Sequence, residues 1–387
     1  MFLARLRHFA LFAAFLFIAG ALGYNLGRRA ANPLVSVVYP RDLGLFWTVW
    51  DKLAADYLDK QALDDDNLVN GAIKGLVASM GDPYTVYLSS AENKQAKEDL
   101  NGRFDGVGLQ LDYNQTNQVI VVAPLPNTPA EKAGIKAGDL ILKVDEQIVD
   151  NFSLPEVVKL IRGPKGTRVK LTLSRAGLTD FFEVDLERST VLVASVELVF
   201  QSDLAHLKLV RFGDQIEREW YRAVDQIVSR RPRGVVLDLR NNTGGYLSGD
   251  VFVASEFLSS GVVVYQESQT GSRESYQVNR QGRLTTIPLV VLLNPGSASA
   301  SEIVAGALQA HHRAKVIGEK SFGKGTVQES EDFPDGAGLH ITIARWLTPT
   351  GQSIDKQGIQ PDLEVKNNQD APIQDLQFAK AVEVLLK

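Results

Sequence analysis

Residues 287–318, which read IPLVVLLNPGSASASEIVAGALQAHHRAKVIG, decide the fold of this chain. Apolar runs predict buried strands over 287–293 and 315–318, and apolar residues at helical spacing predict a helix over 301–311. A strand, a helix and a further strand in this order predict a parallel crossover unit. Sites in such folds lie beyond the carboxyl ends of the strands, so the loop Asn294–Glu302 is a candidate site.

The same alternation continues upstream of this unit. The expected elements are strands over 204–210 and 234–239 and helices over 214–228 and 250–258. We therefore expect an α/β core with a mostly parallel sheet, with bounds of about 189–366. A second candidate loop, Asp238–Gly245, follows the strand over 234–239.

Between residues 101 and 188 the sequence pattern changes to short runs of strand-forming residues, which predicts a small β-rich domain inserted before the core. The expected strands cover 107–111, 119–123, 140–144 and 169–174, with glycine and proline between them. Ser153 and Glu156 have the spacing of a capping box, which predicts a helix start. The inward face of that helix would hold Val157, Val158 and Ile161.

Helices are also expected at both ends of the chain. Helical spacing over 43–58 and 67–79 predicts an N-terminal helical region within 31–100, with Asp66 as an N-cap. The apolar residues of the second helix share one face: Leu68, Val69, Ala72, Ile73, Leu76 and Val77. Residues 367–387 are expected to form a C-terminal helical tail.

The first thirty residues have the pattern of an export signal. Arg5 and Arg7 precede an uninterrupted apolar stretch from Phe9 to Tyr24. The stretch is close to the length of a membrane span, and Ala19-Gly20-Ala21 would suit cleavage of a signal peptide. A core helix would be amphipathic instead. We expect residues 1–30 to be an anchor or a cleaved signal, and the rest to be extracytoplasmic, periplasmic or on the cell surface.

Composition excludes several classes of function. The chain has 387 residues, no cysteine, and five histidines without metal-ligand spacing, so neither thiol chemistry nor a metal centre is expected. Its net charge of -5 comes from interspersed signs and gives no basic stripe for nucleic acid. No cofactor is expected, and the length predicts two or three packed units.

Three serines precede the helix predicted over 301–311. Exposed N–H groups and the helix dipole at this end would stabilise an oxyanion formed beside a serine hydroxyl. The alternative to a catalytic role is a structural one, in which one of these serines is only an N-cap. Residue spacing does not choose among the three, which are Ser297, Ser299 and Ser301.

A nucleophilic serine needs a base. His311 and His312 lie about 18 Å along a helix from Ser299, which is out of reach, while His206 and His340 stay as alternatives. A lysine would need a pKa lowered by burial or positive potential. Lys324 is flanked by glycines that permit a tight turn, and Lys320 is its rival. The phosphate-loop spacing is absent around Lys324.

The β-rich region resembles a PDZ domain of the circularly permuted bacterial protease type. The resemblance rests on Gly106-Val107-Gly108-Leu109, Ala130 to Asp139 and Ile161 to Gly166. It implies that an extended peptide adds as a strand beside Val107 to Leu109. Backbone amides near Gly106 and Gly108 would approach the terminal carboxylate of that peptide. The helix bearing Val157 and Ile161 would close the groove. The implied partners are proteins with apolar C-terminal tails.

Two longer motifs resemble the carboxyl-terminal processing proteases, the tail-specific serine peptidases of family S41. They are Asn294 to Leu308 and Gly318 to Gln328, supported by 66–79, Asp82 to Thr85, Leu237 to Asn242 and Gly358 to Asp362. The resemblance implies a serine endopeptidase that uses a Ser-Lys dyad and an acyl-enzyme. Carried over by position, it implies Ser299 as nucleophile, Lys324 as base, Gln328 as the residue orienting the lysine, and an oxyanion hole from Gly244 or Gly245 and Ala300.

Two departures from the family pattern accompany this resemblance. Ala310 stands where some members have an aspartate, and Thr243 stands where proline or glycine is common. One rival interpretation is a non-catalytic PDZ scaffold, against which the intact Ser299, Lys324 and Gln328 set argues. The other is a hydrolase of non-peptide esters or a retinoid-binding relative, which would have less use for a tail-binding domain. An adaptor protein is a further partner to consider.

Overall fold

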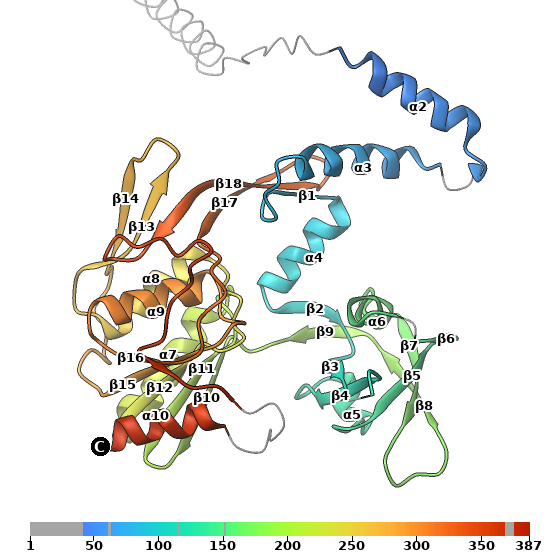
Figure 1. The fold of residues 1–387 in the computed structure, drawn as a ribbon. Coiled ribbons are helices and arrows are strands. Elements are labelled where there is room, and N and C mark those ends of the chain that lie inside the picture. The colour runs from blue at the N-terminus through green and yellow to red at the C-terminus, as the bar shows by residue number, and fades with distance from the viewer. Residues whose placement is uncertain (1–41, 61–62, 115, 151, 368–374) are drawn as a thin grey trace, which may run out of the picture. The chain divides into compact units, whose positions relative to one another are not determined.

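The computed structural model describes residues 42–60, 63–114, 116–150, 152–367 and 375–387 (Figure 1). The chain divides into two compact units, residues 1–68 and 69–387. The predicted export segment, residues 1–30, lies outside the described residues. Within the described ranges, no helix is long and apolar enough to cross a membrane.

Two helices open the described chain, as the apolar spacing predicts. Helix α2 spans Gly44–Asp56, and α3 spans Asp65–Ala78. The predicted N-cap of α3 is wrong by two residues, because the backbone N–H of Asp66 donates to Asp64 Oδ1 at 3.1 Å. A carboxylate just before the first turn satisfies an otherwise unpaired N–H group, and Asp64 has that place.

The core holds the predicted, mostly parallel sheet. Its order is β10-β11-β12-β15-β16-β19, with β10 antiparallel to β11 and the other neighbours parallel. The strands are β10 (Val196–Gln201), β11 (Leu204–Leu209), β12 (Gly234–Asp238), β15 (Leu289–Leu293), β16 (Lys315–Gly318) and β19 (Leu363–Glu364). The α/β fold class is therefore confirmed.

Helices cover both faces of this sheet, so its central strands β12 and β15 are buried at every residue. On β12, Val235 and Leu237 pack into the core under α7, α8 and α9, whereas Val236 packs on the opposite face with Ala381 of α10. Figure 1 shows α10 in red against this sheet. The helices are α7 (Ile216–Arg230), α8 (Leu247–Phe257), α9 (Ala300–Ala310) and α10 (Leu376–Leu386).

A second, antiparallel sheet was not anticipated from the sequence. Its order is β1-β18-β13-β14, and β17 pairs with β18 in a long hairpin. This hairpin carries Gln328 and His340. The elements are β1 (Val86–Leu88), α4 (Ser90–Leu100), β13 (Val262–Ser268), β14 (Arg273–Gln277), β17 (Thr326–Asp332) and β18 (Gly338–Leu347).

The β-rich domain has a sheet of order β3-β4-β5-β7-β8, with β6 paired to β5. Strands β2 and β9, which come before and after this sheet in the chain, pair with each other as a separate two-stranded antiparallel ribbon. The elements are β2 (Arg103–Gly106), β3 (Leu109–Tyr113), β4 (Val119–Pro124), α5 (Pro129–Lys132), β5 (Leu140–Val144), β6 (Gln147–Ile148), α6 (Leu154–Ile161), β7 (Arg168–Ser174), β8 (Phe182–Glu187) and β9 (Ser189–Leu192).

The strand predicted over 107–111 starts two residues later. Gly108 has φ +81°, and a Cβ there would lie 2.3 Å from Thr128. Only glycine fits this position, and its backbone interrupts the strand. Val107 and Gly108 therefore form an irregular link between β2 and β3 rather than part of a strand.

Helix α6 forms as predicted, with the capping box of Ser153 and Glu156. Its inward residues Val157 and Ile161 are buried in the core of the β-rich domain, as is Val107. Packing against the sheet removes these three side chains from the surface, so the peptide-binding role that the PDZ resemblance implies for this region stays a prediction. Leu109 is only partly buried.

Candidate active site

The loop after β15 turns sharply at Ser299, the N-cap of α9. Ser299 has φ +55° and ψ -117°. A non-glycine residue in this region stores strain of about 1–3 kcal/mol, which the surrounding structure must hold in place. The turn leaves Ser299 partly exposed at the start of a helix, where the backbone dipole favours developing negative charge.

The three serines of this loop have different surroundings. The hydroxyl of Ser297 donates to the carbonyl of Leu239 at 2.9 Å, and that of Ser301 donates to the carbonyl of Asn242 at 2.8 Å. Both are fully buried. They fasten the α9 loop to the loop after β12, which leaves Ser299 as the serine that faces a cavity.

Glu302 is the residue of this region that the sequence analysis missed. Its buried carboxylate accepts hydrogen bonds from the N–H groups of Ser299 (2.8 Å), Lys324 (2.9 Å) and Gly323 (2.6 Å) and from the hydroxyl of Ser321 (2.6 Å). Burial raises its pKa, and these four donors oppose the shift. Glu302 thereby joins the serine turn to the lysine loop. The Ser-x-x-Glu spacing of a capping box was the signal for it.

Lys324 lies in the loop between β16 and β17 and lines the same cavity as Ser299. Burial lowers its pKa, and the charge of Glu302 opposes the shift. Its Nζ lies 5.3 Å from the ring centre of Tyr84 and forms no ion pair within the described residues. Lys320, the rival base, is exposed and lines a different cavity.

The shared cavity has a volume of about 800 Å³. Its lining brings together the loops after β12 and β15, the lysine loop and the β17–β18 hairpin, which are distant in sequence. The predicted residues on its wall are Gly244, Gly245, Ser299, Lys324 and Gln328. Apolar side chains complete it, among them Leu247, Ile303 and Trp346.

The candidate oxyanion donors differ in their availability. The N–H of Gly244 donates to Asn242 Oδ1 at 2.9 Å, so in this conformation it is already used. A Cβ on Gly244 would lie 2.8 Å from Ser299 Cβ and 3.1 Å from Ala300 N, which explains why glycine is needed there. The N–H groups of Gly245 and Ala300 have no acceptor in the described part of the chain.

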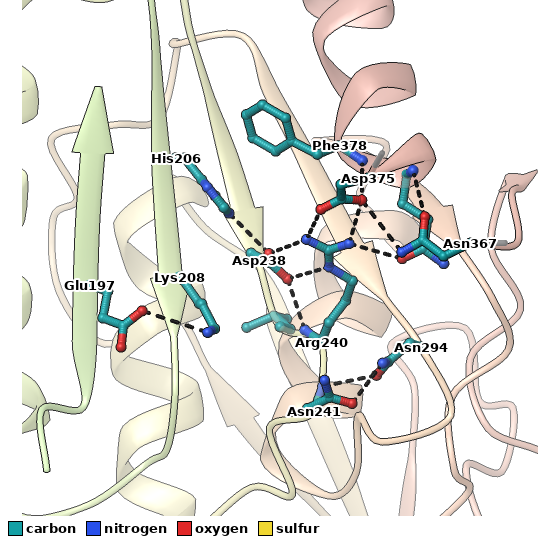
Figure 2. A network of polar contacts seen from close by, with 12 residues as sticks. Glu197, His206, Lys208, Asp238, Arg240, Asn241, Asn294, Asn367, Asp375 and Phe378 are labelled. Atoms are coloured by element: carbon teal, nitrogen blue, oxygen red, sulfur yellow. Dashed lines mark hydrogen bonds and ion pairs between the residues drawn. The ribbon is translucent and has the colours of Figure 1, made fainter. Parts of the chain in front are cut away.

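Paired side chains hold the two loops together. The N–H of Asn241 donates to Asn294 Oδ1 at 2.9 Å, and Asn294 Nδ2 donates to Asn241 Oδ1 at 2.7 Å. Figure 2 shows these contacts beneath a larger network. The carboxyl ends of β12 and β15 are thus fixed to each other, as adjacent parallel strands allow.

The larger network begins at Asp238, the last residue of β12. Its carboxylate accepts from Arg240 at 2.6 Å and contacts His206 Nε2 at 2.9 Å (Figure 2). Arg240 also donates to Asp375 beside α10, at 2.8 Å. Although burial alone would raise it, the pKa of Asp238 is lowered overall by its bonds to Arg240 and His206. The network anchors the first residues of the glycine loop.

Gln328 lines the cavity but does not hydrogen-bond Lys324 within the described residues. Its Nε2 donates to the hydroxyls of Thr326 at 2.7 Å and Thr342 at 3.2 Å. The orienting role that the family resemblance implies therefore lacks a direct contact in this conformation.

The four histidines among the described residues comprise three in structural positions and one at the cavity. His206 belongs to the Asp238 network, His311 contacts the carbonyl of Val262 at 2.7 Å, and His312 follows the end of α9. His340 lines the cavity, and burial and the charge of Lys324 lower its pKa. Among the described residues, no cluster of potential metal ligands occurs.

Comparison with protein families matches three parts of the chain. Residues 203–365 match peptidase family S41, and residues 120–175 match a PDZ domain. Residues 41–92 match the N-terminal domain of the activating protease CtpB. The matched domains define a serine-type peptidase that carries a PDZ domain.

Known proteins extend this likeness along most of the chain. The carboxy-terminal processing protease CtpA of Bacillus subtilis is 36% identical over 319 residues, which cover 82% of this chain and 67% of that protein. A carboxy-terminal-processing protease of Bartonella bacilliformis is 35% identical over 334 residues, 84% and 75% of the two chains. This chain belongs to the carboxy-terminal processing proteases of family S41.

Solved structures agree with this assignment. The photosystem II D1 C-terminal processing protease has a TM-score of 0.53 and 30% identity, with 83% of this chain and 92% of that chain covered. A Bacteroides fragilis structure described as a putative S41 protease has a TM-score of 0.57 at 17% identity, which shows the fold alone, over 90% and 98% of the two chains.

Proposed function

We propose that this peptidase cuts proteins with apolar C-terminal tails by means of a Ser299–Lys324 dyad. The observation that carries the proposal is the shared cavity. Ser299 lies at a strained helix start, and Lys324, which is partly buried and has no ion pair among the described residues, lines the same cavity. Lys320 lines another cavity, which disfavours it as the base.

The proposed reaction begins when neutral Lys324 takes the proton of the Ser299 hydroxyl as Oγ bonds to the peptide carbonyl carbon. The N–H groups of Gly245 and Ala300 stabilise the resulting oxyanion. The C–N bond then breaks, and the leaving amine takes the proton from Lys324. Water attacks the acyl-enzyme and passes a proton to Lys324, which returns it to Ser299 Oγ as the acid product leaves.

Single substitutions test the dyad on a protein substrate with an apolar tail. Ser299→Ala and Lys324→Ala should each lower the cleavage rate at least about 10³-fold, because both groups act on the same proton. Lys320→Ala is the matched control and should cleave normally. Activity that survives Lys324→Ala but is lost in His340→Gln would replace the lysine with a histidine base.

Tail recognition belongs to the proposed role of the PDZ domain. Burial of Val107, Val157 and Ile161 means that binding must use backbone groups near Gly106 and Gly108, with Leu109 beside them. Substrates that end in an apolar residue or in aspartate, otherwise identical, should differ mainly in KM. Equal KM values for the two tails would contradict tail recognition.

We also propose that residues 1–30 export the chain and tether it outside the cytoplasm unless they are cleaved. The apolar stretch from Phe9 to Tyr24 supports this. Cell fractionation and N-terminal sequencing of the mature protein test both outcomes. The match of residues 41–92 to an activating protease's N-terminal domain supports regulation by an adaptor.

A further inference from the structure

Asp250, in the first turn of α8, is a buried carboxyl without a partner. Only 1% of the residue is exposed, and neither side-chain oxygen has a hydrogen-bond partner within the described residues. Burial raises its pKa well above the ordinary value, and the backbone N–H of Val251 offsets this only in part. Burial therefore favours the neutral form of this carboxyl.

Other buried acids in the described chain are paired, which makes Asp250 the exception. Glu256, on the same helix, accepts from Trp220 at 3.2 Å, Arg280 at 2.8 Å and the N–H of Arg283 at 2.6 Å. Glu302 accepts from four donors. An unpaired buried polar group costs stability, so its presence calls for a functional explanation.

Tyr276 and Lys324 do not supply the missing partner of Asp250. The pKa of Tyr276 is raised by burial and, in smaller part, by the charges of Glu274 and Asp250, so this tyrosine lies nearby. Its hydroxyl nevertheless donates to Gln266 at 3.1 Å. The charge that shifts the pKa of Lys324 is that of Glu302 and not that of Asp250, so Asp250 and Lys324 are not a pair.

Asp250 lines the cavity that holds Ser299. Leu247 and Asp250 are three residues apart and so share one face of α8. Ile303, one turn along α9 from Ser299, and Trp346 of β18 line the same cavity. Asp250 is thus the one carboxyl among the described residues that line this cavity, and apolar side chains line it too. The other polar groups of the lining include Lys324, Gln328 and His340.

We propose that Asp250 is a specificity-determining residue that binds the cationic end of a substrate lysine or arginine side chain beside the bond being cut. The proposal rests on the proposed cleavage at Ser299. Lysine and arginine carry a charged end on an apolar stem. The stem fits against Leu247, Ile303 and Trp346, and the ammonium or guanidinium group supplies the hydrogen bonds that Asp250 lacks.

Peptides with one apolar tail test this recognition. Lysine is scanned through each position, with norleucine, which has a similar stem and no charge, as the matched residue. At one position the full chain should cleave the lysine peptide at least about tenfold better in kcat/KM. Asp250→Asn should bring the ratio of the two peptides close to one. Asp214→Asn removes an exposed carboxyl outside the cavity and should keep the wild-type ratio.

Three results would overturn the proposal: no preference for lysine at any position, a preference that survives Asp250→Asn, or an equal loss for both peptides in Asp250→Asn. The last would indicate a structural role. Asp250→Ser serves as a second variant should Asp250→Asn melt early. Binding of the same peptides to Ser299→Ala, measured by calorimetry, needs no cleavage, so a failed dyad and a failed Asp250 site are distinguished.

Discussion

Glu302 and Asp250 are two acids buried beside one cavity, and their surroundings are opposite. Glu302 lies in the first turn of α9 and accepts four hydrogen bonds, whereas Asp250 lies in the first turn of α8 and accepts none from a side chain. Burial raises the pKa of both groups. The difference teaches that burial alone says little about a carboxyl's role. A buried carboxylate whose hydrogen bonds are all made organises the structure, and one that lacks hydrogen-bond partners is available to a ligand.

Replacing each acid with its amide should give the largest contrast. Glu302→Gln puts an NH₂ group against backbone donors, so it should lower the free energy of unfolding by about 3 kcal/mol and disturb Ser299 and Lys324 together. Asp250→Asn breaks no side-chain hydrogen bond and should fold normally. Urea denaturation measures both, with the exposed Glu329→Gln as control. Equal effects of the two amide substitutions would refute the contrast.

The pH dependence of cleavage should respond to one acid and not the other. With neutral Lys324 as the proposed base, kcat/KM should rise about tenfold per pH unit up to a pKa below the ordinary lysine value. Glu302 raises that pKa, so Glu302→Gln should move the profile to lower pH. Asp250→Asn should leave its midpoint in place. An unmoved profile in Glu302→Gln would argue against Lys324 as the titrating group.

Stability as a function of pH should reveal the neutral state of Asp250. Unfolding frees this carboxyl to ionise at its ordinary pKa of 3.8, so above pH 3.8 the folded chain binds more protons than the unfolded chain. Its contribution therefore falls by about 1.4 kcal/mol per pH unit until the folded pKa is reached. Asp250→Asn lacks this loss and should be more stable at pH 8, by at least about 1 kcal/mol, but not at pH 3. Parallel stability curves for the two proteins would contradict a raised pKa.

The smallest expected effect concerns the backbone that Glu302 holds. Ser299 keeps φ +55° while its N–H donates to Glu302. Both Ser299→Ala and Ser299→Gly remove the hydroxyl, but glycine has no Cβ to strain at positive φ. The free energy of unfolding of Ser299→Gly, measured in urea, should therefore be about 1 kcal/mol higher than that of Ser299→Ala. If alanine is the more stable variant, the turn is not strained.

The sequence by itself determined the layered α/β core, because apolar periodicity follows directly from which faces are buried. It also predicted the small β-rich domain and the capping box at Ser153. It failed at the N-cap of α3, because Asp66 and Asp64 are equally good caps by composition. It left peptide binding open, because Val157 and Ile161 mark a buried helix face without saying whether a peptide reaches it.

Only the tertiary structure decided how the loops meet. Hydrogen bonds of Ser297 and Ser301 to the neighbouring loop separate them from Ser299, and the course of the chain after β16 places Lys324, rather than Lys320, on the cavity. The burial of Asp250 could not be predicted from the sequence, since an acid in a first helical turn usually faces solvent. These contacts join residues from distant strands and helices, so they depend on packing that local sequence patterns do not encode.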